Sequence, residues 1–311
     1  MDDIRLTVND DLSVTIYDFN RESVVEYTLM DVVERYYKNS KLTIREVIVD
    51  KKELTKSEIK LISVLCQEHT QVIGMNIDNT NSSEIFEAQI LIPYRAKGPN
   101  IFRKSQLHKF LQHMNDYLSK VHPKLIYKLI IIEQNNDHMF NRGRLLNIGF
   151  LERENEVGYR IKYYIHHNCD LFPNVEQEPK LDYSFTPMNE VRDIFGYSGG
   201  IGGIAVFNRL TFSQIQGFPN DYFNWGAEDT TLHKRCERNS IDIKRPLYNI
   251  GVHEESHSRD SSHNDINSRK GEKDSPDTNG LQTCKYTCEI NNNSEFDYEN
   301  VIHYLADFDQ N

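Results

Sequence analysis

The sequence predicts an α/β protein with a Rossmann-like βαβ core. Short apolar runs at residues 89–93 and 126–132 are typical of buried strands, and the second is continuous enough to lie inside a parallel sheet. Each run is followed by a segment expected to be helical, over 102–118 and 142–153. Strands that alternate with helices in this way are typical of parallel α/β sheets.

A third strand is expected at residues 160–165, and the chain continues from it into the polar segment that contains Asp170. Open α/β sheets bind their ligands beyond the carboxyl ends of the strands. Asp170 is therefore expected at the edge of the sheet where a ligand would bind.

Composition changes along the chain suggest three regions. Residues 1–87 end in a polar run at 79–83 and form an N-terminal extension or small α/β subdomain of unknown role, and residues 88–293 form the main domain. The last residues, 294–311, are acidic and are expected to be a loosely packed C-terminal tail. Within the main domain, residues 251–280 have almost no apolar content, so we expect a mobile loop or lid there.

The charge balance argues against nucleic acid as a partner. The 311 residues include 36 Lys and Arg against 47 Asp and Glu, a net charge of -11. No run of 18 apolar residues and no signal-peptide pattern is present, so we expect a soluble protein without a transmembrane segment, cytoplasmic or encoded by a virus or microbe. The five scattered cysteines suggest reduced thiols rather than a disulfide framework.

A glycine-rich segment at 196–200 and a second segment at 217–229 are the most informative for chemistry. Glycines there would let the backbone approach a ligand closely. Trp225 is the single Trp of the chain and stands beside Gly226. Its ring could stack on the face of a sugar, and the alternative is a core Trp next to a turn.

Two carboxylates, Glu228 and Asp229, begin a segment that is expected to be helical and that ends in basic residues. One interpretation is that they only complement the dipole of that helix. The other is functional, with one carboxylate removing a proton from an acceptor hydroxyl while its neighbour holds the acceptor.

Asp170, Glu254 and His257 are the candidate metal ligands. Glu254 precedes His257 by three residues, so both could lie on one side of a turn or helix. Hard oxygen ligands with one imidazole suit Mn²⁺ or Mg²⁺. Taken alone, His257 is better explained as one of three solvated histidines in the polar stretch 253–263.

Five segments, in this order, resemble motifs of the β-1,4-galactosyltransferase family (glycosyltransferase family 7). The resemblance covers about residues 88–290 and rests on Ile92-Pro93-Tyr94-Arg95, on Phe140 to Phe150, on Asn168-Cys169-Asp170-Leu171-Phe172-Pro173, on Trp225-Gly226-Ala227-Glu228-Asp229 and on His257-Ser258-Arg259-Asp260. These are similar to the family's Pro-Phe-Arg, Phe-Asn-Arg-Ala-Lys-Leu-Leu-Asn-Val-Gly-Phe, Asp-Val-Asp-Leu-x-Pro, Trp-Gly-Gly-Glu-Asp and His-Ser-Arg-Asp motifs.

The resemblance implies a GT-A glycosyltransferase fold with a mobile lid and an inverting transfer of a sugar from a UDP-sugar to a glycan or glycoside acceptor. It implies Mn²⁺ as cofactor, with Mg²⁺ as the alternative, held by Asp170, Glu254 and His257. Asp229 would be the general base and Glu228 would hold the acceptor. The implied UDP-sugar contacts are Pro93, Tyr94, Arg95, Lys97, Phe140, Arg142, Tyr197, Gly199, Gly200 and Trp225. Tyr197 stands where the family carries Tyr when the donor is UDP-galactose.

Departures from the family pattern leave other activities open. Asn168 replaces the first Asp of the metal motif, Glu254 stands where many relatives have Met, and Thr230 and Thr231 replace acidic residues. The alternatives are an N-acetylgalactosaminyl- or glucosyltransferase of the chondroitin-synthase-like type and a catalytically weak sugar-binding relative.

Overall fold

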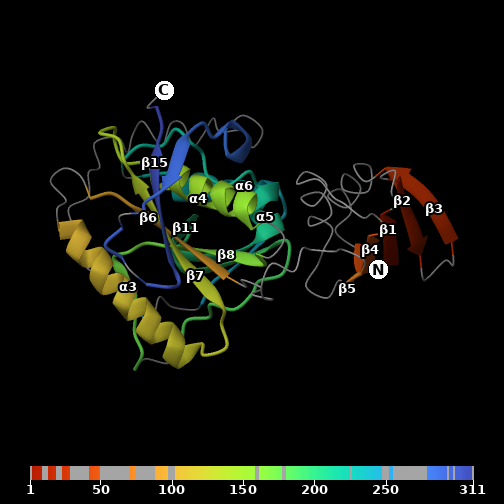
Figure 1. Cartoon of the computed structure of the whole chain (residues 1–311), viewed down its shortest axis with the longest axis horizontal. Coiled ribbons are helices and arrows are strands. Elements are labelled where there is room, and N and C mark those ends of the chain that lie inside the picture. The colour runs from red at the N-terminus through yellow and green to blue at the C-terminus, as the bar shows by residue number, and fades with distance from the viewer. Residues whose placement is uncertain are drawn as a thin grey trace. The chain divides into compact units, whose positions relative to one another are not determined.

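The computed structural model contains two compact units, residues 1–84 with 157–160 and residues 85–156 with 161–311 (Figure 1). In the first unit the structure describes the strands and residue 157, which continues the described segment 102–157 of the second unit. In the second it describes residues 88–96, 102–157, 161–176, 180–224, 226–246, 252–254, 279–292, 294–296 and 298–309.

The first unit is built on a mixed five-stranded sheet with the order β3-β2-β1-β4-β5. Its strands are β1 (Asp2–Val8), β2 (Ser13–Asp18), β3 (Ser23–Thr28), β4 (Leu42–Val49) and β5 (Gln71–Ile73). The first three strands form an antiparallel meander, while β4 lies parallel to β1 and β5 parallel to β4. The described strands of residues 1–84 therefore form a mixed sheet of their own.

The second unit is an α/β domain around an eight-stranded mixed sheet with the order β12-β10-β11-β8-β6-β7-β15-β14. Its strands are β6 (Ala88–Tyr94), β7 (Tyr127–Gln134), β8 (Tyr163–His167), β10 (Glu190–Tyr197), β11 (Gly200–Asn208), β12 (Asp242–Lys244), β14 (Thr287–Ile290) and β15 (Val301–Asp307). A separate pair joins β9 (Leu171–Pro173) to β13 (Val252–Glu254). Its helices are α3 (Phe102–Val121), α4 (Arg142–Glu156), α5 (Arg209–Gln214), α6 (Glu228–Arg238) and the short η2 (Leu281–Thr283).

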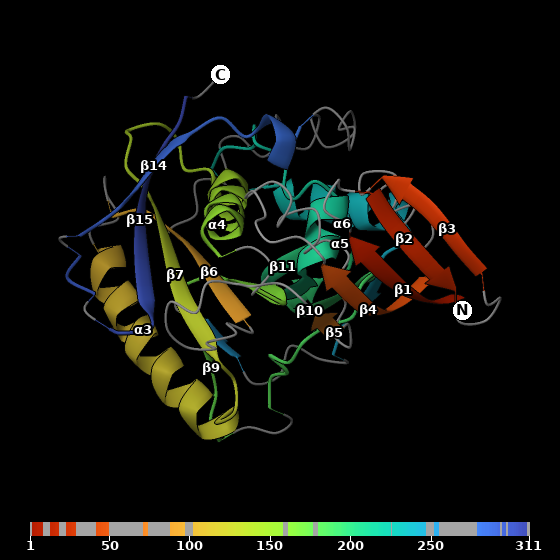
Figure 2. The ribbon, with the colours of Figure 1, turned by 45° about the vertical axis from the view of Figure 1, so that its right-hand side comes forward.

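The centre of the sheet has the expected βαβ arrangement. Strand β6 pairs in parallel with both β7 and β8, and α3 and α4 connect the three strands in chain order. Helix α3 lies on one side of these strands and α4 on the other (Figure 2). The predicted α/β class and the βαβ core are therefore confirmed.

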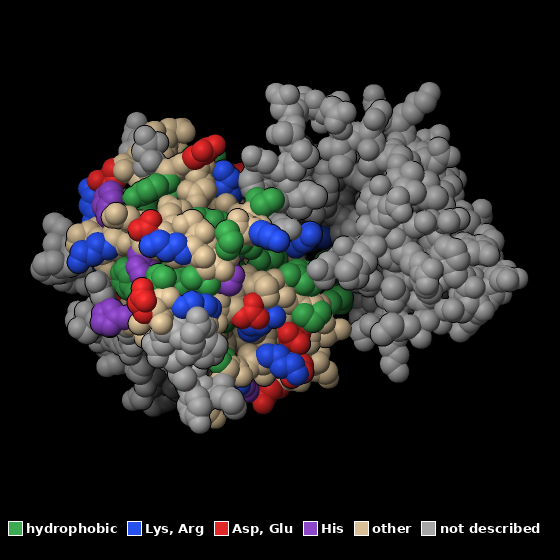
Figure 3. All heavy atoms as spheres, turned by 90° about the horizontal axis from the view of Figure 1, so that it is seen from below, with side chains coloured by type: hydrophobic (Ala, Val, Ile, Leu, Met, Phe, Trp, Pro, Cys, Tyr) green, Lys and Arg blue, Asp and Glu red, His purple; other side chains and the backbone are tan. Residues whose placement is uncertain are grey.

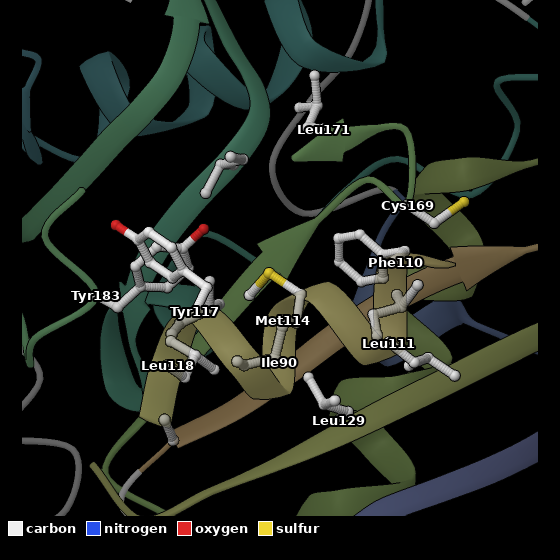
Figure 4. Close-up of a cluster of buried hydrophobic side chains, with 14 of the residues drawn as sticks. Ile90, Phe110, Leu111, Met114, Tyr117, Leu118, Leu129, Cys169, Leu171 and Tyr183 are labelled. Carbon is white, nitrogen blue, oxygen red and sulfur yellow. The ribbon is translucent and has the colours of Figure 1, made fainter. Parts of the chain in front are cut away.

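Side chains of the central strands alternate between the two helical layers, as the pleat of a strand requires. Ile90 and Leu129 face α3, where they join the buried Phe110, Met114 and Leu118 (Figure 4). On the opposite face α4 comes so close that a methyl group on Gly149 would meet Ile132 at 2.7 Å. Dense packing on both faces fixes the position of the strand ends that carry the site.

The expectation of a loosely packed tail at 294–311 is wrong. Residues 301–307 form β15, an interior strand that runs parallel to β7 and antiparallel to β14. Tyr304 and Ala306 are buried at 1% and 0% exposure, which outweighs the acidic character of the segment. Within β15 the buried residues are His303, Tyr304 and Ala306, while Asp307 stays exposed.

The described surface carries mixed charge. On the face shown in Figure 3, basic and acidic side chains are interspersed over the coloured part of the molecule. Within the described ranges no helix has both the length and the apolar character needed to cross a bilayer.

Candidate active site

Arg142 is the centre of the candidate site. It is the first residue of α4, and its side chain is only 10% exposed. The guanidinium donates hydrogen bonds to Asp229 Oδ1 at 2.6 Å, to Asn168 Oδ1 at 2.8 Å and to the Gly202 carbonyl at 3.0 Å. One arginine thus links helix α6, the loop after β8 and strand β11.

The two carboxylates beside Arg142 come from the first turn of α6. Asp229 accepts the short hydrogen bond, and Glu228 Oε1 lies 3.7 Å from the same guanidinium nitrogen. The turn before the helix is tight, because Gly226 has φ 121° and Ala227 has φ 69°. A non-glycine residue in the left-handed region costs roughly 1–2 kcal/mol, and such strain often occurs at functional sites.

Burial and charge together shift the pKa values of this cluster. Burial and, to a smaller extent, the charge of Asp229 raise the pKa of Glu228 to about 7, against the opposing effect of Arg142. Burial also raises the pKa of Asp229, and Arg142 partly offsets that increase. Burial alone would lower the pKa of Arg142, but the two carboxylates raise it overall. Arg142 therefore favours the ionised form of Asp229, whereas Glu228 can carry a proton near neutral pH.

Asp170 lies in the loop that joins β8 to β9 and is buried, with 5% exposure. The antiparallel pairing of β9 with β13 places Glu254 opposite Leu171, the residue after Asp170. The sheet therefore brings two of the three predicted metal ligands to adjacent backbone positions. Across the part of the chain that the structure describes, no group of three His, Cys, Asp or Glu side chains is placed to hold a metal.

Arg103 is a second basic residue of the site, and nothing in the sequence motifs pointed to it. It stands in the first turn of α3, and its Nη1 lies 3.8 Å from Asp170 Oδ2. Its side chain is 21% exposed, so it can still reach solvent or a ligand. The only sequence signal for it is a basic residue at the start of a predicted helix, which is a common feature.

The residues predicted to hold the nucleotide fall into two groups. Arg95 stacks its guanidinium 5.6 Å from the centre of the Phe140 ring and donates a hydrogen bond to the His138 carbonyl. Pro93 and Tyr94 are buried in β6, and the Tyr94 ring, 2% exposed, belongs to the core against α3. Arg95 and Phe140 therefore contact each other, whereas Pro93 and Tyr94 are buried within the strand.

The turn between β10 and β11 carries Tyr197, Gly199 and Gly200. Gly199 has φ 87°, a conformation that favours glycine. A methyl group on Gly200 would meet the Tyr197 ring at 2.2 Å, so the ring rests directly on this glycine. The Tyr197 hydroxyl lies 3.1 Å from Thr230 Oγ1 in α6, although the residue is 51% exposed. The turn thereby presents an aromatic hydroxyl next to Glu228 and Asp229.

The segment 216–221 supports the site from beneath. Asn147 of α4 donates to the Phe218 carbonyl at 2.7 Å, and the buried Arg235 of α6 donates to the Gly217 carbonyl at 2.8 Å. Asn220 donates to the Gly280 carbonyl at 2.7 Å. These bonds connect helices α4 and α6 to the segment 216–221 and connect that segment to Gly280.

Three predicted site residues lie outside the described residues: Lys97, Trp225 and His257. The same holds for the Glu254 side chain and for most of the segment expected to be a lid, 255–278. The predicted site residues that the structure brings into contact are Arg142 with Asp229 and Glu228, Arg95 with Phe140, and Tyr197 with Gly200.

Comparisons with known proteins agree with the motifs. Residues 46–180 match a family model described as the N-terminal region of glycosyl transferase group 7, and residues 186–258 match one described as the N-terminal domain of galactosyltransferase. Human beta-1,4-galactosyltransferase 4 is 32% identical over 189 residues, 58% of this chain and 51% of that protein. Human beta-1,4-galactosyltransferase 2 is 30% identical over 193 residues, 58% of this chain and 48% of that protein. The chain spans about half the length of the curated relatives it matches.

The fold is also that of solved structures. The catalytic domain of Drosophila beta1,4-galactosyltransferase 7 in complex with xylobiose aligns with a TM-score of 0.57 at 22% identity, covering 72% of this chain and 94% of that one. A mutant of the same protein in complex with manganese, UDP-Gal and xylobiose aligns with a TM-score of 0.58 at 21% identity, over the same shares of the two chains. At this identity the match establishes the fold, which is the predicted GT-A arrangement.

Proposed function

Because the chain belongs to glycosyltransferase family 7, we propose that it is an inverting galactosyltransferase that uses UDP-galactose and a divalent metal. The acceptor would be a hydroxyl of a glycan or glycoside, and the product would be a β-linked galactoside. The donor and metal are supported by the neighbour that was solved with manganese and UDP-Gal.

The observation that carries this proposal is the buried contact between Arg142 and Asp229. A general base must be ionised when the acceptor binds, yet burial favours the protonated acid. Arg142 resolves the conflict by holding Asp229 Oδ1 at 2.6 Å, which stabilises the carboxylate in its charged form. The second oxygen, Oδ2, is the one we assign to the acceptor hydroxyl.

Asp170 fits a metal site by its chemistry and its place. Its carboxylate is a hard oxygen ligand at the carboxyl end of the central strands, and the β9–β13 pair brings the backbone of Glu254 beside it. Asp170 and Glu254, with His257, would hold Mn²⁺ or Mg²⁺. A bound cation would neutralise charge on the diphosphate leaving group. Arg103 is close enough to Asp170 to contact the same diphosphate.

The remaining steps belong to the chain's own residues. Arg95 and Phe140 would hold the uridine, and Tyr197 with Gly199 and Gly200 would line the donor sugar. The acceptor oxygen would attack the anomeric carbon from the face opposite UDP and pass its proton to Asp229 Oδ2. The bond from the anomeric carbon to the diphosphate breaks as the new glycosidic bond forms, so configuration inverts. Glu228, which can carry a proton near neutral pH, would donate a hydrogen bond to the acceptor sugar.

A donor screen tests this proposal. The full-length protein would be incubated with UDP-galactose, UDP-N-acetylgalactosamine or UDP-glucose, with Mn²⁺ or Mg²⁺, and with simple acceptor glycosides. A β-xyloside is included because xylobiose is bound in both structural neighbours. We expect acceptor-dependent UDP release with UDP-galactose and a β-anomeric proton signal in the product. Sugar binding without acceptor-dependent UDP release from any donor would contradict an enzymatic role.

A further inference from the structure

A buried ion pair lies behind the candidate site and is not used by the proposed mechanism. Asp193 of β10 has a fully buried side chain, and its Oδ2 lies 2.8 Å from Nε of Arg245, which follows β12. The Arg245 side chain is 29% exposed and therefore covers Asp193 on the side nearer to solvent. A buried carboxylate is costly unless it is paired and hydrogen-bonded, so this position calls for an explanation.

The backbone around Asp193 is shaped to receive its carboxylate. The register between β10 and β11 shifts on both sides of Phe195. A methyl group on Gly196 would meet Asp193 Oδ2 at 2.0 Å, and one on Gly202 would meet the Phe195 carbonyl at 2.1 Å. The irregular hairpin and its two glycines thus form the space that the carboxylate fills.

The first link from this pair leads to the catalytic carboxylate. Asp193 Oδ1 accepts a hydrogen bond from the Gly202 N–H at 3.1 Å, and the Gly202 carbonyl accepts one from Arg142 at 3.0 Å. Arg142 in turn holds Asp229 at 2.6 Å. Asp193 thereby fixes the backbone residue on which the guanidinium of Arg142 rests.

The second link leads to the donor side of the site. Arg245 donates from Nη2 to the Gly200 carbonyl at 3.1 Å while its Nε holds Asp193. Gly200 is the residue that supports the Tyr197 ring. The planar fork of an arginine can make these two contacts at once, whereas a lysine offers a single amine.

We propose that Asp193 and Arg245 are positioning residues that set the two halves of the active site in register with each other, Asp193 through Gly202 and Arg142, and Arg245 through Gly200 and Tyr197. This inference rests on the proposed galactosyltransferase function. Neither residue touches a substrate in it. Their role is to hold the base and the sugar-facing turn at a fixed separation. A small misplacement of reacting groups strongly lowers the rate of the reaction.

The electrostatic surroundings of Asp193 show how its buried carboxylate depends on Arg245. Burial raises the pKa of Asp193 to about 6, even though the Gly202 N–H and Arg245 both act to lower it. The other titratable groups facing it come from α6, namely Asp229 and Cys236, and both lack a positive charge. Arg245 is therefore the cation on which the ionised form of Asp193 depends.

Two conservative variants separate the two links. Asp193→Asn replaces the charged acceptor of the Gly202 N–H by a neutral amide oxygen, which accepts a weaker hydrogen bond and so loosens the first link. Arg245→Lys keeps the charge near Asp193 but removes the fork that also holds Gly200. The matched control is Asp182→Asn, which removes the surface ion pair between Asp182 and Arg192 of the same strand, with an N–O distance of 3.1 Å.

Steady-state kinetics with UDP-galactose provide the first test. We expect Arg245→Lys to raise the KM for UDP-galactose about tenfold, because a hydrogen bond from a charged group to the turn is lost. We expect Asp193→Asn to lower kcat about tenfold with a smaller effect on that KM, since it acts on Arg142 and the base. The double variant should lose less than the product of the two single losses, because the residues act as a pair. If the two residues only stabilised the fold, both variants would unfold at a lower temperature, without one affecting mainly KM and the other mainly kcat.

A second test does not depend on turnover. Full-length protein labelled with ¹⁵N-glycine and with ¹³C at the isoleucine carbonyl selects the amides of glycines that follow isoleucine, which are Gly74, Gly149, Gly202 and Gly251. We expect Asp193→Asn to move the Gly202 amide signal and to leave Gly149 in place. Asp182→Asn should move neither.

The two readouts distinguish failure of this inference from failure of the proposed function. A wild-type protein that transfers no sugar refutes the function, and the positioning inference that rests on it then falls with it. An active wild type whose Asp193→Asn and Arg245→Lys variants match Asp182→Asn in kcat and KM overturns the inference alone. An unmoved Gly202 amide in folded Asp193→Asn also overturns it, because the first link would be absent.

Discussion

Arg142 and Asp229 face each other across the start of two helices, with 2.6 Å between guanidinium nitrogen and carboxylate oxygen. Both residues lie in the first turn of their helices, where backbone N–H groups also favour negative charge. The sequence left open whether Glu228 and Asp229 only complement a helix dipole. The structure shows them in that position and also paired with a buried arginine from another element.

Replacing Arg142 by Lys should separate charge from geometry. Lysine keeps a positive charge beside Asp229, but it cannot also hold Asn168 Oδ1 and the Gly202 carbonyl. We expect transfer to fall about a hundredfold from misplacement of the base. We expect Arg142→Ala to lose about 3–5 kcal/mol of unfolding free energy as well, since it leaves buried charge without a partner. Urea unfolding and turnover measure the two effects. Equal stability of Arg142→Ala and wild type would contradict the description of this cluster.

The raised pKa of Glu228 predicts how stability changes with pH. Its pKa is about 7 in the folded protein against an ordinary value of 4.5, so the folded state binds the proton more tightly than the unfolded chain does. The stabilisation is complete below pH 4.5 and is lost as pH rises through 7. Glu228→Gln cannot titrate. Between pH 5 and pH 8 the wild type should therefore lose unfolding free energy relative to Glu228→Gln, by about 1–3 kcal/mol. If the unfolding free energy changed with pH in the same way in both proteins, Glu228 would not be buried in its protonated form.

Asp170 should matter for metal-dependent binding of the nucleotide. Asp170→Ala removes a buried carboxylate that we assign to the metal, so UDP should bind at least tenfold more weakly in the presence of Mn²⁺. Isothermal titration calorimetry with and without Mn²⁺ measures this. In the absence of metal the variant should bind UDP as well as or better than wild type, because Arg103 is released from Asp170. Unchanged Mn²⁺-dependent affinity would exclude Asp170 as a ligand.

Ala227 provides a test of strain in the turn before α6. Its φ of 69° lies in the left-handed region, where glycine has no Cβ penalty. Ala227→Gly should raise the unfolding free energy by about 0.5–1 kcal/mol, with the greater entropy of the unfolded glycine reducing the gain. Thermal unfolding measures the change, and Ala306→Gly at a buried, paired position of β15 is the control that should destabilise. A loss of stability in Ala227→Gly would mean that the turn relaxes in solution.

Much of the fold could be predicted because its elements have strong local patterns. The apolar run at 126–132 became β7 (Tyr127–Gln134), and the helical spacing at 102–118 became α3 (Phe102–Val121). β15 was missed because its buried residues lie within an acidic segment, and only the partners β7 and β14 reveal that they are paired. Local composition cannot show pairing between strands that are far apart in the chain.

Site residues could be predicted from the sequence where they stand in a motif. They could not be predicted where only tertiary contacts bring them to the site. Asp170, Glu228 and Asp229 stand in recognisable motifs. Arg103 and Asp193 do not, because an arginine in a helix and an aspartate in a strand gain their meaning only from what the fold packs against them. Tyr94 stands inside a predicted binding motif and is also buried in the core, and sequence alone did not reveal this second environment.

The most direct test of the proposed mechanism is the turnover of Asp229→Asn. Asparagine has nearly the same shape and can still accept the hydrogen bond from Arg142, but it cannot take a proton from the acceptor. With UDP-galactose, Mn²⁺ and an acceptor on which the wild type is active, we expect kcat to fall at least a thousandfold, a loss of about 4 kcal/mol in transition-state stabilisation, while UDP-galactose binds with wild-type affinity. Turnover within tenfold of wild type would contradict Asp229 as the base.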